Sequence, residues 1–196
     1  SEPTSFTAAA TEVATAATWG GRNTDRHMSS RTPSEFAPKS AGDEPGFSVT
    51  TSKPEPIPFT SITGVVIQDN TAQEGGGLHI TGAGNGLVVD DTTIRSNTAI
   101  TNGGGIFNTG GAVTVTNSSL LRNSAGNGGA LYQDDGVTSV TTSCIVKNSD
   151  TAVNYFGGTA PITATSNWWG DATGPAGVAP GYGDSVSGGV DFSNFR

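Results

Sequence analysis

The sequence predicts an all-β fold in which about four to five coils stack as a parallel solenoid, and three observations support this. Glycine accounts for 29 of the 196 residues, and charged residues make up only 13%. Glycine and β-branched residues disfavour helices, whereas threonine and valine suit a pleated sheet. The third observation is a repeat of about 25 residues, in which the apolar, glycine and asparagine positions stay in phase from one repeat to the next.

Asparagine marks the same place in four repeats, each time three residues after an aliphatic residue. The four asparagines, in steps of 27, 26 and 25 residues, are Asn70, Asn97, Asn123 and Asn148. Asparagine tolerates the left-handed backbone conformation, and its amide can hydrogen-bond to nearby backbone. We therefore expect each asparagine to adopt that conformation at a turn. Together they would form a structural ladder rather than a ligand site.

Aliphatic residues form two further columns with the same steps, five residues apart within each repeat. The predicted core column comprises Val89, Val115, Val140, Ile94, Leu120, Ile145 and Trp169. A single coil cannot bury its apolar side alone, so like residues stack on like and share one core. Glycine-rich runs at 75–77, 103–105 and 128–129 supply the backbone angles that tight corners demand.

The chain divides into a Ser/Thr/Pro-rich N-terminal arm (1–58), the β-helix repeats (59–170) and a C-terminal cap (171–196). Prolines interrupt the arm and discourage regular structure there. Because the arm is too polar to build its own core, we expect it to lie against its own domain or a neighbouring subunit. The aromatic residues expected to make these assembly contacts are Phe6, Trp19, Phe36, Phe47 and Phe59.

The paired signature Ile/Leu-x-x-Asn and Gly-Gly-Ala/Gly-Ile/Leu resembles the repeats of chlamydial-type polymorphic outer-membrane proteins. The segment Asn-Trp-Trp-Gly-Asp at 167–171 resembles the last-coil motif of secreted right-handed parallel β-helices. This resemblance implies a three-faced, right-handed solenoid with an extracellular or cell-surface location. It implies little about activity, because that fold hosts lyases, hydrolases, adhesins and inert scaffolds.

Composition and spacing argue against several functions. A net charge of −8 without a Lys/Arg patch disfavours nucleic acid, and no apolar run approaches the ~20 residues that would insert into a membrane. The single cysteine, Cys144, excludes an intramolecular disulfide framework. The doublets Asp90-Asp91 and Asp134-Asp135 occupy different places in the repeat, so they should not converge as glycosidase carboxylates do. We therefore expect no enzyme activity, and no catalytic residue, metal site or cofactor.

Three functional hypotheses follow, from different classes. The ends of a solenoid expose unpaired backbone groups, to which an extended arm can add strands. The first hypothesis is an extracellular structural subunit that self-assembles end to end into a filament, with the arm bridging subunits. The alternatives are a polysaccharide-binding or polysaccharide-degrading domain, in which Trp168 offers a sugar-stacking ring, or a monomeric adhesin with the arm folded back on its first coil.

Overall fold

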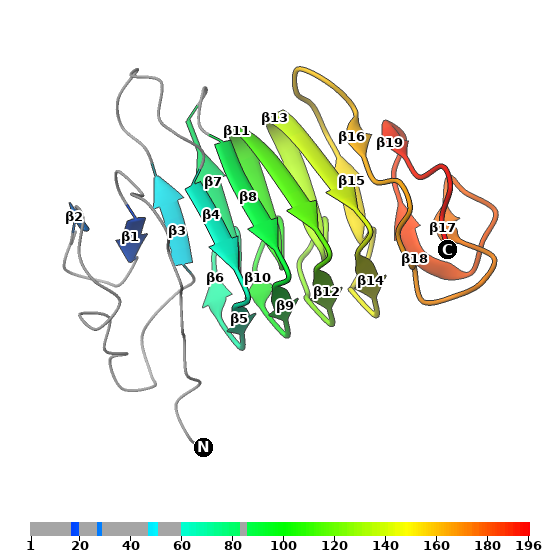
Figure 1. Cartoon of the computed structure of the whole chain (residues 1–196), viewed down its shortest axis with the longest axis horizontal. Coiled ribbons are helices and arrows are strands. Elements are labelled where there is room, and N and C mark those ends of the chain that lie inside the picture. Colours follow the sequence, from blue (N-terminus) through cyan, green and yellow to red (C-terminus); the bar gives the residue numbers. More distant parts are fainter. Residues whose placement is uncertain (1–16, 20–26, 29–46, 51–59, 83–85) are drawn as a thin grey trace.

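The chain is a parallel β-solenoid of about five turns (Figure 1). The structure, a computed structural model, describes residues 60–82 and 86–196, together with the backbone of three short strands at 17–19, 27–28 and 47–50. Every regular element within these residues is a strand. They include no helix long and apolar enough to cross a membrane.

The strands form three long stacks, in which each strand pairs in parallel with its counterparts one coil away. The first stack contains β7 (Leu78–Thr81), the N-terminal halves of β11 (Ile106–Thr116) and β13 (Leu131–Thr141), and β15 (Val153–Tyr155). The second contains β4 (Thr60–Thr63), β8 (Gly86–Asp90), the C-terminal halves of β11 and β13, β16 (Ile162–Thr163) and β19 (Val190–Asp191). The third contains β5 (Val66–Gln68), β9 (Thr93–Arg95), β12 (Ser119–Leu121) and β14 (Cys144–Val146).

Shorter strands complete the molecule. A two-stranded pair at one corner joins β6 (Thr71–Ala72) to β10 (Thr98–Ala99). The C-terminal region adds β17 (Pro175–Gly177) and β18 (Gly183–Val186), which pair with each other, and β18 continues the first stack beyond β15. The N-terminal region adds β1 (Ala17–Trp19), β2 (His27–Met28) and β3 (Phe47–Thr50).

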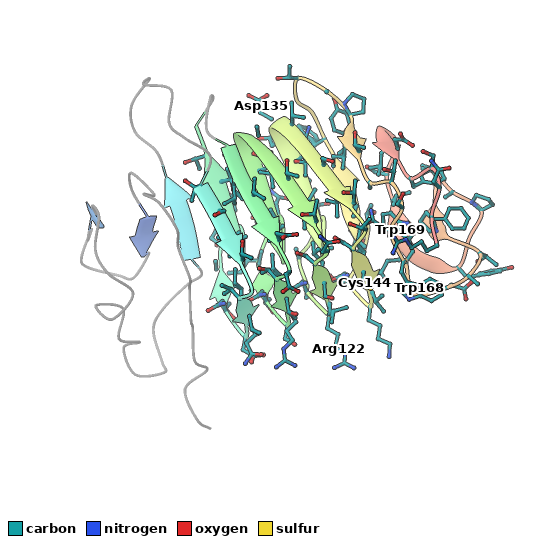
Figure 2. All side chains as sticks on the ribbon, viewed as in Figure 1. Arg122, Asp135, Cys144, Trp168 and Trp169 are labelled. Carbon is teal, nitrogen blue, oxygen red and sulfur yellow. The ribbon has the colours of Figure 1, made fainter. Side chains whose placement is uncertain are left out.

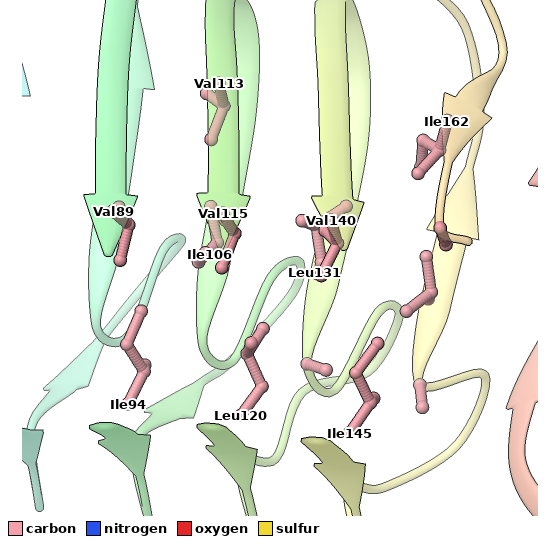
Figure 3. Packing of buried hydrophobic residues seen from close by; sticks show 14 of the residues in the cluster. Val89, Ile94, Ile106, Val113, Val115, Leu120, Leu131, Val140, Ile145 and Ile162 are labelled. Carbon is pink, nitrogen blue, oxygen red and sulfur yellow. The ribbon is translucent and has the colours of Figure 1, made fainter. Parts of the chain in front are cut away.

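The interior is a set of stacked aliphatic columns, and strand register places like residues directly above one another (Figure 3). Val115 pairs with both Val89 and Val140, while Leu120 pairs with both Ile94 and Ile145. These six side chains and Trp169 are fully buried, with 0% exposure. Each such side chain contributes about 1.5–3 kcal/mol before its conformational entropy is subtracted.

The sharp corners place the left-handed conformation one residue earlier than the sequence analysis expected. The residue directly before each ladder asparagine has a positive φ: 58° at Asp69, 54° at Ser96, 53° at Arg122 and 60° at Lys147. The asparagines themselves do not, so the expectation that they adopt this conformation is wrong. The physical reason is that the asparagine amide hydrogen-bonds to the neighbouring coils, which leaves the reversal to the residue before it.

Two strands of the arm extend the first stack past β7. β3 pairs in parallel with β7, so that Phe47 lies opposite Leu78, and β1 runs antiparallel to β3, so that Trp19 lies opposite Phe47. These parts of the arm therefore pair with the first coil of their own chain. The other three aromatic residues of the arm, Phe6, Phe36 and Phe59, lie outside the described residues.

Truncation of one inward leucine and of its outward neighbour tests this core. Leu120→Ala removes a fully buried side chain and should lower the free energy of unfolding by about 2–5 kcal/mol, because a cavity remains. Leu121→Ala, at the adjacent half-buried position on the outer face, should cost much less. Chemical denaturation measures both, and equal losses would contradict the inward assignment of the column.

Candidate functional site

The four asparagines form a continuous hydrogen-bonded ladder along the solenoid axis. The Oδ1 atom of Asn97 accepts the backbone N–H of Asn70 at 3.2 Å and its Nδ2–H at 2.9 Å. Asn123 does the same for Asn97, at 3.1 and 3.0 Å, and Asn148 for Asn123, at 2.9 and 3.1 Å. Because Asn97 and Asn123 are almost fully buried, these amides satisfy backbone groups that water cannot reach.

The ladder ends on a residue that the sequence analysis did not single out, Asp184 in β18. Its Oδ2 atom accepts the backbone N–H and the Nδ2–H of Asn148 at 2.9 and 2.8 Å, and its Oδ1 accepts the backbone N–H of Lys147 at 2.8 Å. One coil earlier, the equivalent N–H of Arg122 donates to the carbonyl of Val146 at 3.1 Å. One carboxylate thus replaces two acceptors of a further coil, an asparagine amide and a backbone carbonyl.

Asp184 is a partly buried carboxylate, and burial raises its pKa above the ordinary range. The three N–H groups from Asn148 and Lys147 act in the opposite direction. No periodic signal identifies this residue, since it lies 36 residues after Asn148 instead of one repeat later.

A second ladder of hydrogen bonds runs along another corner, the one between the second and third stacks. Its members lie three residues after the valine or alanine column, and they are Thr92, Ser118, Ser143 and Asn167. Each side-chain oxygen accepts the backbone N–H one coil earlier, for example Ser118 Oγ from Thr92 at 3.1 Å and Asn167 Oδ1 from Ser143 at 2.9 Å. This ladder was not predicted, although the spacing that its members share is a sequence signal for it.

An aromatic row lies on the outer side of the first stack. The ring centroids are 4.8 Å apart for His79 and Phe107, 5.6 Å for Phe107 and Tyr132, and 6.2 Å for Tyr132 and Phe156. Burial lowers the pKa of His79, with nearby Glu74 acting in the opposite direction. The Nε2 atom of His79 is buried, and it has no hydrogen-bond partner among the residues that the structure describes. The imidazole therefore packs as an aromatic ring in its neutral form.

The two aspartate doublets lie at opposite ends of the strands of the second stack. Asp90 closes β8 opposite Thr116, whereas Asp135 lies opposite Thr109 at the irregular bend of β13 (Figure 2). Thr109 and Thr116 are seven residue steps apart along β11, a span on the order of 20 Å. Asp90 also accepts hydrogen bonds from Thr116 Oγ1 at 2.7 Å and Asn117 Nδ2 at 3.0 Å, which lower its pKa. No group of metal-ligating side chains occurs among the described residues.

The two tryptophans have different environments. Trp169 is fully buried in the core, whereas Trp168 is half-buried and continues the outward column of the third stack beyond Cys144 (Figure 2). The thiol of Cys144 is free and half-buried. Of the two rings, only Trp168 offers surface to a ligand.

No protein-family model, curated protein or solved structure matches this chain. The assignment of a parallel β-solenoid therefore comes from the strand pairing of this structure alone. The resemblance of its repeats to polymorphic outer-membrane proteins, which no family match supports, stays a prediction.

Replacement of Asp184 by asparagine tests how the ladder ends. The new amide can still accept from Asn148, but it must turn an N–H group toward the N–H of Lys147. We expect the free energy of unfolding to fall by about 1–3 kcal/mol. The exposed Asp134→Asn carries the same charge change and should have little effect. If Asp184→Asn unfolds at the same denaturant concentration as the wild type, the second oxygen is not needed as an acceptor.

Replacement of His79 by phenylalanine tests the aromatic row. Because the pKa of His79 is lower in the folded chain than in the unfolded one, the unfolded state takes up a proton first as the pH falls. The stability that His79 contributes is complete above about pH 6.5 and is lost as the pH drops through and below that value. His79→Phe should flatten this part of the stability profile, measured by denaturation across a pH series. Identical slopes for both proteins would contradict the assignment.

Proposed function

We propose that the chain is a non-enzymatic structural subunit, extracellular or on the cell surface, whose solenoids assemble end to end into a filament. The observation that carries this proposal is the open edge of the first coil. Among the described strands, β4, β5 and β6 each pair on one side only, with β8, β9 and β10. An edge strand with free N–H and C=O groups is a template for pairing with another chain.

The first rung of the asparagine ladder supports strand addition at this edge. Asn70 is the first rung of the asparagine ladder, and no described residue donates to its Oδ1 atom. In every later rung the equivalent atom accepts two N–H groups from the coil before, as Asn97 does from Asn70. A further strand in front of β5 would supply donors of this kind.

The opposite end of the molecule is built differently (Figure 1). Asp184 and the strands β17 to β19 cover the last coil, and the cap exposes large apolar side chains: Val178 (63% exposed), Tyr182 (83%) and Phe195 (40%). These exposed side chains are available for contact with another molecule at this end. Contact between two unlike ends is heterologous, and a heterologous contact that does not close into a ring propagates as a filament.

The arm fits a bridging role through the pairing that it already makes. In the single chain β3 pairs with β7 of the same chain. The same register is open to β7 of a second copy, because exchange of an identical element between copies replaces each bond of the pair by an equivalent one. Since β7 belongs to the first coil, a copy that donates β3 would tie itself to the first coil of the second copy, in addition to the contact between unlike ends.

Assembly is tested by electron microscopy of the full chain together with its mass in solution. We expect regular fibres from the full chain and folded monomers after deletion of residues 1–57. Unchanged assembly after the deletion would exclude the bridging role of the arm. Particles of monomer mass from the full chain at every concentration would overturn the filament and favour a monomeric adhesin.

A point variant separates the open edge from the arm. Thr93 N–H donates to the carbonyl of Val65 at 2.8 Å, so by the alternation of a parallel ladder the N–H of Val66 faces the open edge. Val66→Pro removes this donor without breaking the bonds between β5 and β9, and it should shorten or abolish fibres while the chain stays folded. Val66→Thr is the matched control. Normal fibres from Val66→Pro would show that this edge takes no part.

A further inference from the structure

Positive charge is concentrated on one corner of an otherwise acidic solenoid. The repeats and cap contain ten acidic residues and only four basic ones, Arg95, Arg122, Lys147 and Arg196. The first three are exposed and occupy consecutive coils at the corner that follows the third stack; Figure 2 shows Arg122 projecting from this edge. We call these three residues the basic corner.

The backbone places these three residues on successive coils, at or next to the same corner. Arg122 and Lys147 both take the left-handed conformation directly before a ladder asparagine, and Arg95 ends β9 one residue before the same position. The N–H groups of Arg122 and Lys147 donate to the next coil or cap. Successive coils are about 4.8 Å apart. One cation is therefore presented per coil along the axis.

The three side chains are available to a ligand, since within the described residues no ion pair joins any of them to a carboxylate. Beside them, the outer side of the third stack presents the hydroxyl groups of Thr93 and Ser119 and, farther along the same column, the half-buried ring of Trp168. The surface thus combines one cation per coil with hydroxyl groups and a flat apolar ring.

We propose that the basic corner binds an acidic polysaccharide, a linear chain with one carboxylate or sulfate per sugar, lying along the solenoid axis. The coil spacing is comparable to the length that one pyranose adds to an extended chain, so each anion meets one cation. Hydroxyl groups and an aromatic ring suit a sugar, which has hydroxyl edges and an apolar face. Nucleic acid fits less well, because its phosphates follow one another at about 3.4 Å along each strand, more closely than one cation per coil of about 4.8 Å can match. This proposal does not depend on filament assembly.

The row also has a definite end. Asp69 occupies the corner position of the first coil, equivalent to Arg122 and Lys147, and has the same left-handed backbone with φ 58°. Its carboxylate repels an anionic chain at that point. A lysine there would extend the row by one coil, in a backbone conformation that Lys147 already adopts with φ 60°.

The test is binding of polygalacturonate to the full chain at low salt, measured by calorimetry, with heparin as the sulfated probe. Replacement of Arg95, Arg122 and Lys147 together by glutamine should weaken binding about tenfold and reduce its dependence on salt, since each exposed ion pair contributes modestly. Asp69→Lys should tighten binding several-fold. Glu74→Lys, with the same charge change at another corner, should not. Light scattering on each variant verifies that assembly is unchanged.

The choice of probes distinguishes the type of anion that is bound. Preference for polygalacturonate or for heparin identifies the anion as carboxylate or sulfate. Fully methyl-esterified polygalacturonate, which lacks the charges, should bind at least about tenfold more weakly. Equal binding of the esterified chain, equal binding by the triple variant, or equally tight binding of single-stranded DNA would each overturn the proposal.

Discussion

Hydrogen bonding between coils is the constraint on which the rest of this structure depends. The asparagine ladder passes through buried positions, where an unpaired amide would cost free energy, so each asparagine must meet its counterpart one coil away. This requirement fixes the register of β5, β9, β12 and β14. The same register places Ile94, Leu120 and Ile145 above one another, so the ladder and the core specify a single stacking arrangement.

A ladder of this kind creates a difficulty at its ends, because the last amide needs a partner that no further coil supplies. At the C-terminal end the solution is Asp184. A carboxylate accepts hydrogen bonds through both oxygens, so one side chain satisfies the three N–H groups that Lys147 and Asn148 present. At the N-terminal end β3 covers β7, while the described parts of the chain leave β4, β5 and β6 with a free edge. The proposed assembly in one direction depends on this asymmetry of the two ends.

The outward positions obey much looser rules than the inward ones. Equivalent places on the corner hold Asp69, Ser96, Arg122 and Lys147, which share a backbone conformation and little else. Stacking constrains the main chain there and leaves the side chain free. Function that depends on surface charge can therefore be altered along this corner without a change in the core. Because stacking does not require cations at this corner, their presence on an acidic solenoid points to a role in binding, as proposed above.

The sequence by itself determined whatever repeats along the chain. The period, the inward columns, the asparagine ladder and the separation of the two aspartate doublets were all predictable, because like residues recur at like places. The ladder of Thr92, Ser118, Ser143 and Asn167 carried the same signal and was overlooked. The left-handed residue before each asparagine was misplaced, since spacing alone does not say which of two neighbours reverses the chain. Tertiary structure alone decided that Asp184 ends the ladder and that β3 pairs with β7. Both contacts join segments outside the repeat, where no period links a residue to its partner and only folding brings them together.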